Sequence, residues 1–96
     1  MTVHVLPSQL RIKPPFPVEQ AMAVDGTKVW VAIEWPVIER WLGPRANDAD
    51  AVREALHERR LEIERTVEAH VFAHGLALSK EVSLTVEDFK ERVPRR

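Results

Sequence analysis

The chain has 96 residues, of which 45% are hydrophobic and 30% are charged, with 14 Lys and Arg against 15 Asp and Glu. These proportions are typical of a small globular domain and exclude a disordered chain or a fibrous repeat. The near-neutral balance gives no overall field to attract nucleic acid or an anionic membrane, and the absence of cysteine excludes disulfides and thiolate chemistry.

Residues 1–96 are expected to form a single domain, because a chain of this length has room for one modest core. No apolar run reaches the roughly 18 residues of a membrane span, and the start "MTVHVLPSQLRIK" lacks the features of a signal peptide. We therefore expect a cytoplasmic protein without membrane association. The tail, residues 94–96, is expected to be frayed.

The first segment, residues 1–17, is rich in proline. Alternating apolar and basic residues predict a short edge strand over residues 9–13, before the break "KPPFP". The prolines exclude a helix here. We interpret "PPFP" as a stiff connector; the alternative is a proline-rich ligand for an aromatic groove.

The next segment predicts a β-hairpin. Apolar residues alternate with others from Val18 to Val24 and again from Val29 to Trp35, on either side of Asp25 and Gly26. An Asp-Gly pair suits a tight hairpin turn because both central residues must accept positive φ.

Trp30 is the irregular residue of this hairpin, since it falls on the face that carries Lys28 and Glu34. Two interpretations fit. Either a helix covers this second face, which we favour, or Trp30 is a partly exposed aromatic residue on a contact surface.

Two helices follow. Pro36 suits a first turn, Val37, Ile38, Trp41 and Leu42 form one stripe, and "GP" at residues 43–44 ends this short helix. A long helix is predicted over residues 48–74, with Asn47 or Asp48 as N-cap and Gly75 as C-terminal stop. Its apolar stripe, interrupted by Arg59 and Arg60, comprises Ala49, Val52, Leu56, Ile63, Val67 and Val71.

The predicted long helix is too long for a domain of this size. It would extend about 40 Å, whereas the domain is expected to be about 32 Å across. The helix must therefore protrude, bend, or pack on a second copy of the chain. Leu61 and Phe72 lie off the main stripe, three turns apart, and are candidates for a protein contact together with Trp30.

The stretch "SLTVEDF", residues 83–89, predicts the end of a strand and the start of a last helix. With Thr85 as N-cap, its hydroxyl would accept from the amide of Asp88, and the Asp88 carboxylate would return to the Thr85 amide. We interpret the adjacent acids as this capping box and not as a catalytic pair.

His70 and His74 have the four-residue spacing of a helical metal-binding pair. The zinc-protease motif is not met, because "HVFAH" has Val71 where that motif has its glutamate, and no third ligand stands nearby. The favoured interpretation is structural: two histidines at the negative end of the helix dipole. We therefore assign no catalytic, cofactor-binding or metal residue.

The order "DGTKVWVAIEWPVIERWLG", then "RRLEIE", then "VSLTVEDF" resembles the small bacterial family known as domain of unknown function 1488 over residues 18–89. The likeness consists of a strand, a short helix ending in aromatic-aliphatic-glycine, a longer helix and a closing "LT..DF". The resemblance implies a small α+β fold and no established activity.

The sequence thus predicts an α+β domain: a small antiparallel sheet, made of the hairpin and a further strand or two, packed with one short, one long and one short C-terminal helix. We expect an interaction module that contacts itself as a homodimer or another protein, without catalysis or cofactor. One alternative is a metal-dependent enzyme using His70 and His74. The other is a weak nucleic-acid binder with a basic face made of Arg11, Lys13, Lys28 and the C-terminal arginines.

Overall fold

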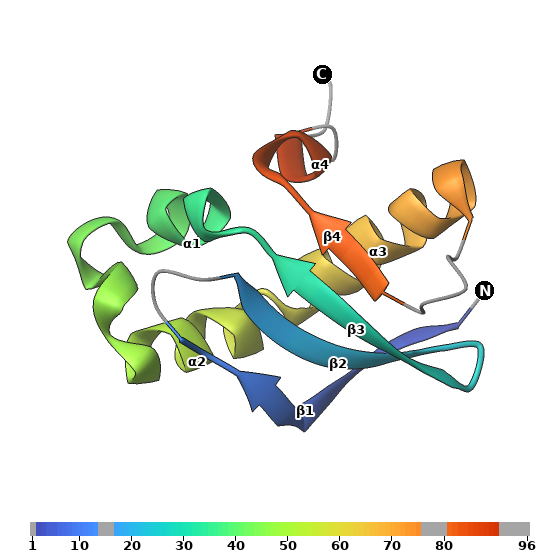
Figure 1. Ribbon diagram of the computed structural model, residues 1–96, viewed down its shortest axis with the longest axis horizontal. Helices are drawn as coiled ribbons and strands as arrows, with labels where there is room; N and C mark the ends of the chain where they lie inside the picture. The colour runs from blue at the N-terminus through green and yellow to red at the C-terminus, as the bar shows by residue number, and fades with distance from the viewer. Residues whose placement is uncertain (1, 14–16, 76–80, 91–96) are drawn as a thin grey trace.

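The computed structural model describes residues 2–13, 17–75 and 81–90. In these ranges one four-stranded sheet packs against helices, which confirms the predicted α+β class (Figure 1). The strands are β1 (Val3–Arg11), β2 (Val18–Val24), β3 (Thr27–Ile33) and β4 (Glu81–Leu84), in that spatial order. The helices are α1 (Trp35–Leu42), a 3₁₀ helix (Gly43–Asn47), α2 (Ala49–Glu58), α3 (Arg60–His74) and α4 (Val86–Lys90). The molecule is 19 Å deep along its shortest axis, as expected for two layers.

The hairpin forms as predicted. β2 and β3 pair antiparallel from Val18 opposite Ile33 to Val24 opposite Thr27. The turn has Asp25 at φ 51° and Gly26 at φ 84°, the positive angles that this tight connection requires. The local sequence therefore determines this part of the sheet.

β1 is longer than the predicted edge strand at residues 9–13. It starts at Val3 and pairs antiparallel with β2, but its register is interrupted between Val5 and Leu10. Pro7 lies inside this interruption, where an edge strand tolerates the loss of a backbone donor. On the free edge, the Val5 N–H donates to Glu64 Oε2 of α3 at 3.0 Å. Residues 14–16 of the proline-rich connector lie outside the described part of the chain, as do residues 94–96.

β4 runs parallel to β3, with Val31 opposite Val82 and Ile33 opposite Leu84. The sheet is therefore mixed, and the expectation of a purely antiparallel sheet was wrong in this detail. The helices between β3 and β4 make the long crossover that a parallel pair requires.

The predicted long helix bends at Arg59 and forms α2 and α3 instead of one continuous rod. Arg59 has φ −99° and ψ 18°, which are outside the helical range. Its guanidinium lies 4.8 Å from the centre of the Trp41 ring and 3.2 Å from Glu62. The bend resolves the excess length predicted from the sequence. The helix ends form as expected: Asp48 accepts from the amides of Asp50 and Ala51, and Gly75 donates to Val71 O.

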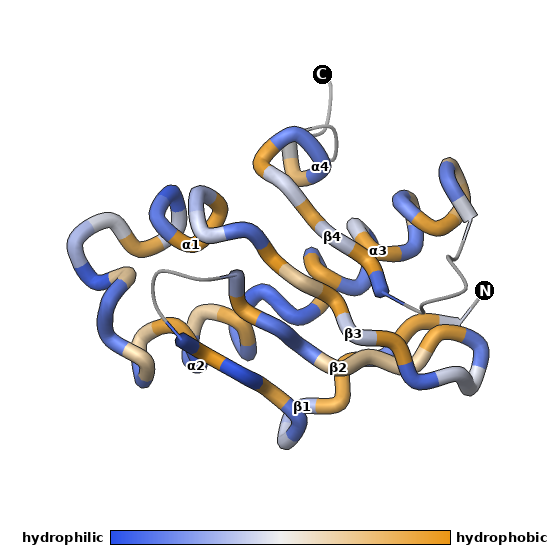
Figure 2. The backbone as a smooth tube through the Cα atoms, viewed as in Figure 1, coloured by the Kyte–Doolittle hydropathy of each residue, from blue (hydrophilic) through white to orange (hydrophobic). Residues whose placement is uncertain are grey.

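The core lies between one face of the sheet and the helices; in Figure 1, α2 and α3 pass behind the sheet, and α1 and α4 lie above it. Figure 2 shows apolar segments along β2, β3 and the helix stretches that face them. Ala49, predicted in the apolar stripe, is exposed in the first turn of α2. The core residues are Val18, Met22, Val24, Val29, Val31, Ile33, Trp35, Val37, Ile38, Ala46, Val52, Leu56, Ile63, Val67, Val82, Leu84 and Phe89.

Among the helices in the described ranges, none is long and apolar enough to cross a lipid bilayer.

Candidate functional site

Trp30 lies on the sheet face opposite the core and is half-buried. The preferred expectation of a covering helix was wrong, because the helices in the described ranges pack on the other face (Figure 1). Two cations cover the ring instead: the Arg11 guanidinium lies 4.1 Å and the Lys28 ammonium 5.0 Å from its centre. Ala21, the residue opposite Trp30 on β2, is fully buried.

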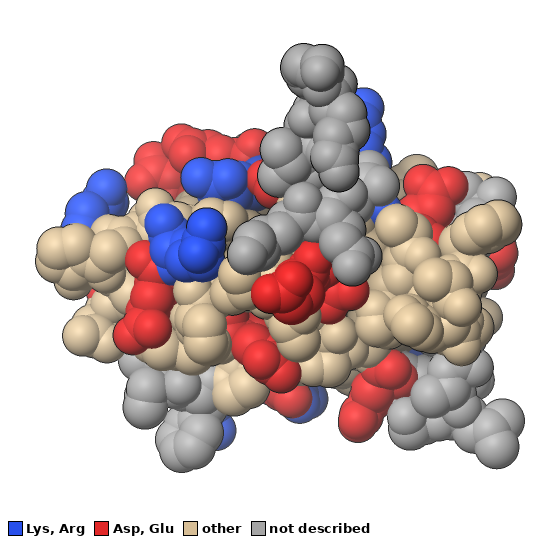
Figure 3. Space-filling model, turned by 90° about the horizontal axis from the view of Figure 1, so that it is seen from above, with Lys and Arg blue, Asp and Glu red and all other residues tan. Residues whose placement is uncertain are grey.

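Two members of the predicted basic face, Arg11 and Lys28, thus meet at Trp30. Arg11 is also paired with Glu19 at 3.2 Å, and these two residues line a shallow hollow of about 370 Å³ together with Lys13. The C-terminal arginines lie outside the described residues. On another side of the molecule, seen from above, Figure 3 shows acidic groups interspersed with basic ones. The described residues therefore assemble a small cationic cluster around one aromatic ring and not a continuous basic face.

His70 and His74 lie together at the end of α3, with ring centres 4.8 Å apart. His70 Nδ1 is 3.4 Å from Asp88 Oδ1, so this histidine links α3 to α4. Within the described residues, no group of three His, Asp or Glu side chains is placed to hold a metal ion. The contact with Asp88 gives His70 a structural connection that the sequence spacing did not indicate.

Leu61 and Phe72 are the large apolar side chains that α3 exposes, at 58% and 86% of their surface. Both lie opposite the residues that α3 buries, Ile63, Thr66 and Val67. Between them on the same exposed side lie Arg65 and Glu68, at helical spacings of four, three and four residues. We call Leu61, Arg65, Glu68 and Phe72 the α3 strip. Trp30 lies on the opposite layer, so the three predicted contact residues form two separate surfaces.

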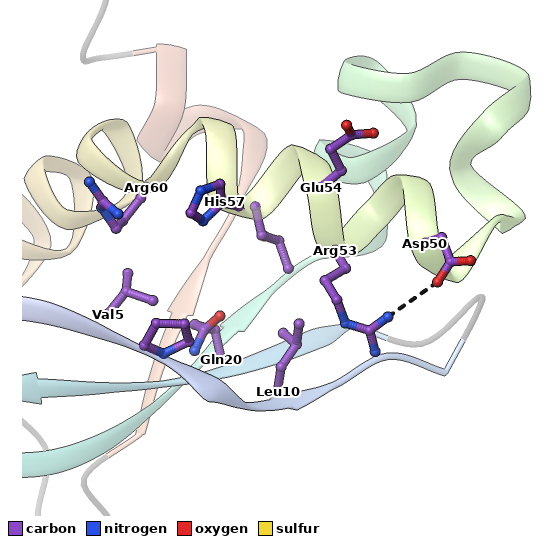
Figure 4. A pocket seen from close by; sticks show the side chains of 10 residues that line it. Val5, Leu10, Gln20, Asp50, Arg53, Glu54, His57 and Arg60 are labelled. Atoms are coloured by element: carbon purple, nitrogen blue, oxygen red, sulfur yellow. Dashed lines mark hydrogen bonds and ion pairs between the residues drawn. The ribbon is translucent and has the colours of Figure 1, made fainter.

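A groove that the sequence did not predict separates β1 from α2 and the start of α3 (Figure 4). Its cavity measures about 560 Å³. The strand wall includes Val5, Pro7, Leu10 and Gln20, and the helix wall Leu56, His57 and Arg60. One sequence signal could have indicated it: Gln20 is the polar residue in the apolar alternation of β2, and it is 2% exposed.

The buried Gln20 side chain shapes this groove. Its Nε2 donates to Leu6 O at 2.8 Å and to Gln9 O at 3.2 Å, the carbonyls that the register interruption of β1 releases from pairing. Nε2 also donates to Ala21 O at 2.9 Å, so three carbonyl oxygens surround this nitrogen. Gln20 therefore ties the displaced part of β1 to β2.

Comparison with known proteins adds no assignment: no family model, curated protein or solved structure matches the chain.

Proposed function

We propose that the protein is a non-catalytic interaction module that pairs with a second copy of itself through the α3 strip. The observation that carries this proposal is the two-fold symmetry of the strip. Leu61 and Phe72 lie at equal distances on either side of the midpoint between Thr66 and Val67, and so do Arg65 and Glu68.

A two-fold interface requires this symmetry. When residue i of one copy contacts residue j of the other, residue j of the first copy must also contact residue i of the second. If two α3 helices lie antiparallel about the midpoint, Leu61 faces Phe72 of the second copy, and Arg65 faces Glu68 of the second copy. The two apolar positions of each copy then contact apolar residues of the other copy, and the two charged positions contact residues of opposite charge. A parallel arrangement would instead place each charge beside its own kind.

The strip is free to make these contacts. All four side chains are exposed, and among the described residues neither Arg65 nor Glu68 has an ion pair. From Leu61 to Phe72 the strip is about 16 Å long. One helix face of this length buries less than a standard interface, so we expect a weak dimer with a dissociation constant of roughly 0.01 to 1 mM.

Charge reversal tests the geometry directly. Arg65→Glu alone places carboxylates opposite carboxylates across the two-fold axis, and Glu68→Arg alone places guanidinium groups opposite guanidinium groups, so neither variant should dimerise. A mixture of the two variants should associate, because every charged contact between them pairs opposite charges. Arg40→Glu, an exposed change of the same kind on α1, is the matched control and should dimerise like the unmodified protein.

Sedimentation velocity between about 10 µM and about 1 mM gives the readout. The proposal fails if the unmodified protein remains a monomer throughout this range. It also fails if the mixture associates no better than either charge variant alone.

We also propose a cytoplasmic location, as expected from the sequence. We likewise propose the relationship to the family known as domain of unknown function 1488, which rests on residues 25–43, 59–64 and 82–89. Neither adds an activity to the proposed interaction.

A further inference from the structure

The groove between β1 and α2 has the dimensions and lining of a small-molecule site. Its volume of about 560 Å³ falls in the usual range for ligand pockets, about 300 to 1,000 Å³. Val5, Pro7, Leu10 and Leu56 give it an apolar interior. Such sites add a few convergent polar groups that orient the ligand, and two are present here.

The first polar group is the side-chain oxygen of Gln20. The three carbonyls around Nε2 fix the orientation of the amide, because only its nitrogen can donate to them. The oxygen therefore faces the other way, into the groove, as Figure 4 shows. Among the described residues no donor reaches this oxygen, and it is open to the groove, not sealed in the core. An acceptor in this position favours a ligand that brings an N–H or O–H group.

The second polar group is the cation of Arg60, which lies with His57 on the helix wall (Figure 4). Among the described residues Arg60 has no ion pair, whereas Arg53, at the other end of the groove, is held by Asp50 at 3.3 Å. Glu54 also lines the groove, but its carboxylate points away from the strand wall in Figure 4. Arg60 is therefore the lining cation without an ion pair among the described residues, and the Glu64 carboxylate lies at Val5, where it accepts from the backbone N–H at 3.0 Å.

We propose that this groove binds a small organic carboxylate with an apolar body and a hydrogen-bond donor, such as an N-acylated amino acid. The carboxylate pairs with Arg60, the N–H donates to Gln20 Oε1, and the acyl chain lies along Val5, Leu10 and Leu56. This site is separate from the α3 strip and does not depend on dimerisation.

Three matched probes test the proposal by titration of ¹H–¹⁵N spectra of the full chain. N-hexanoyl-leucine carries all the required groups. N-hexanoyl-leucinamide lacks the charge, and an ester analogue, in which oxygen replaces the amide N–H, lacks the donor. We expect shifts at Val5, Leu10 and Leu56, with the acid binding about tenfold more tightly than either analogue.

Arg60→Gln identifies the partner of the carboxylate. It should weaken binding of the acid about tenfold and leave binding of the neutral amide unchanged. Arg40→Gln on α1 removes the same charge outside the groove and should change neither. Gln20 is tested through the ester and not by substitution, because its amide also supports β1.

The proposal is overturned if millimolar acid shifts no groove resonance, or if the acid binds no better than the amide and the ester. It is also overturned if Arg60→Gln leaves the preference for the acid intact. A chain that stays monomeric yet binds the acid in the groove would refute the proposed dimer and support this site.

Discussion

The Asp88 carboxylate accepts hydrogen bonds from both the backbone N–H and the hydroxyl of Thr85, at 2.8 and 3.2 Å. Only one half of the predicted capping box is therefore present. The carboxylate returns to the Thr85 amide as expected, but the Thr85 hydroxyl donates to that carboxylate instead of accepting from the Asp88 amide. The Asp88 amide donates to the backbone carbonyl of Thr85 at 3.1 Å. Asp88 is thus the residue on which the start of α4 depends.

We predict that Asp88→Ala destabilises the fold more than Thr85→Ala. Asp88→Ala removes both hydrogen bonds and the contact with His70, and should lower the free energy of unfolding by about 1 to 2 kcal/mol. Thr85→Ala keeps the backbone N–H bond to Asp88 and should cost only about 0.5 kcal/mol. Urea denaturation measures both, with Ser83→Ala on β4 as control. The opposite ranking would assign the cap to the Thr85 hydroxyl.

Stability should also fall in acid because of Asp88. Partial burial acts to raise the pKa of this carboxyl, but the Thr85 backbone N–H, His70 and the Thr85 hydroxyl outweigh it, and the pKa is lowered from 3.8. A group with a lowered folded-state pKa stabilises the protein above its unfolded-state pKa, and this contribution is lost as the pH falls through the folded-state value. The unfolded chain takes up the proton first.

Asp88→Asn isolates this effect, since it removes the titrating group at one site and leaves the other carboxylates in place. Between about pH 6 and about pH 3, the urea midpoint of the unmodified protein should fall further than that of the variant. Parallel decreases in the two proteins would show that Asp88 does not contribute to the acid sensitivity.

Gln20→Glu, which replaces the side-chain NH₂ group with an oxygen, should strongly lower the free energy of unfolding. It replaces the donor that serves Leu6 O and Gln9 O with an oxygen, and it introduces a charge at a position that is 2% exposed. We expect a loss of about 2 to 4 kcal/mol at neutral pH. Gln9→Glu makes the same chemical change on β1, where the side chain is only partly buried, and should cost much less. Equal losses would mean that Gln20 does not support the displaced part of β1.

Features set by neighbouring residues could be predicted from the sequence. Asp25 and Gly26 determine the hairpin turn, Asp48 caps α2 through amides two and three residues away, and Gly75 ends α3. The exposure of Leu61 and Phe72 follows from their phase opposite the buried stripe. In each case the determining groups lie within a few helical or turn positions.

Features set by distant residues could not be predicted. A bend was one of three expected outcomes for the long helix, but its position at Arg59 coincides with a contact to Trp41, which belongs to another helix. The parallel direction of β4 depends on the path of three α-helices and a 3₁₀ helix. The groove depends on how β1 shifts its register against Gln20 on β2. The periodicity of a single segment contains none of this information.

The register interruption of β1 also limits how the sheet can grow. An exposed, regular edge strand is a template for adding strands from other molecules, which leads to aggregation. In β1 the interruption, Pro7 and the bond from the Val5 N–H to Glu64 remove this template, and β4 at the other edge has only four residues, Glu81–Leu84. These edge features disfavour the open-ended addition of further copies through their strands. Association through a two-fold helix surface, by contrast, stops at two molecules.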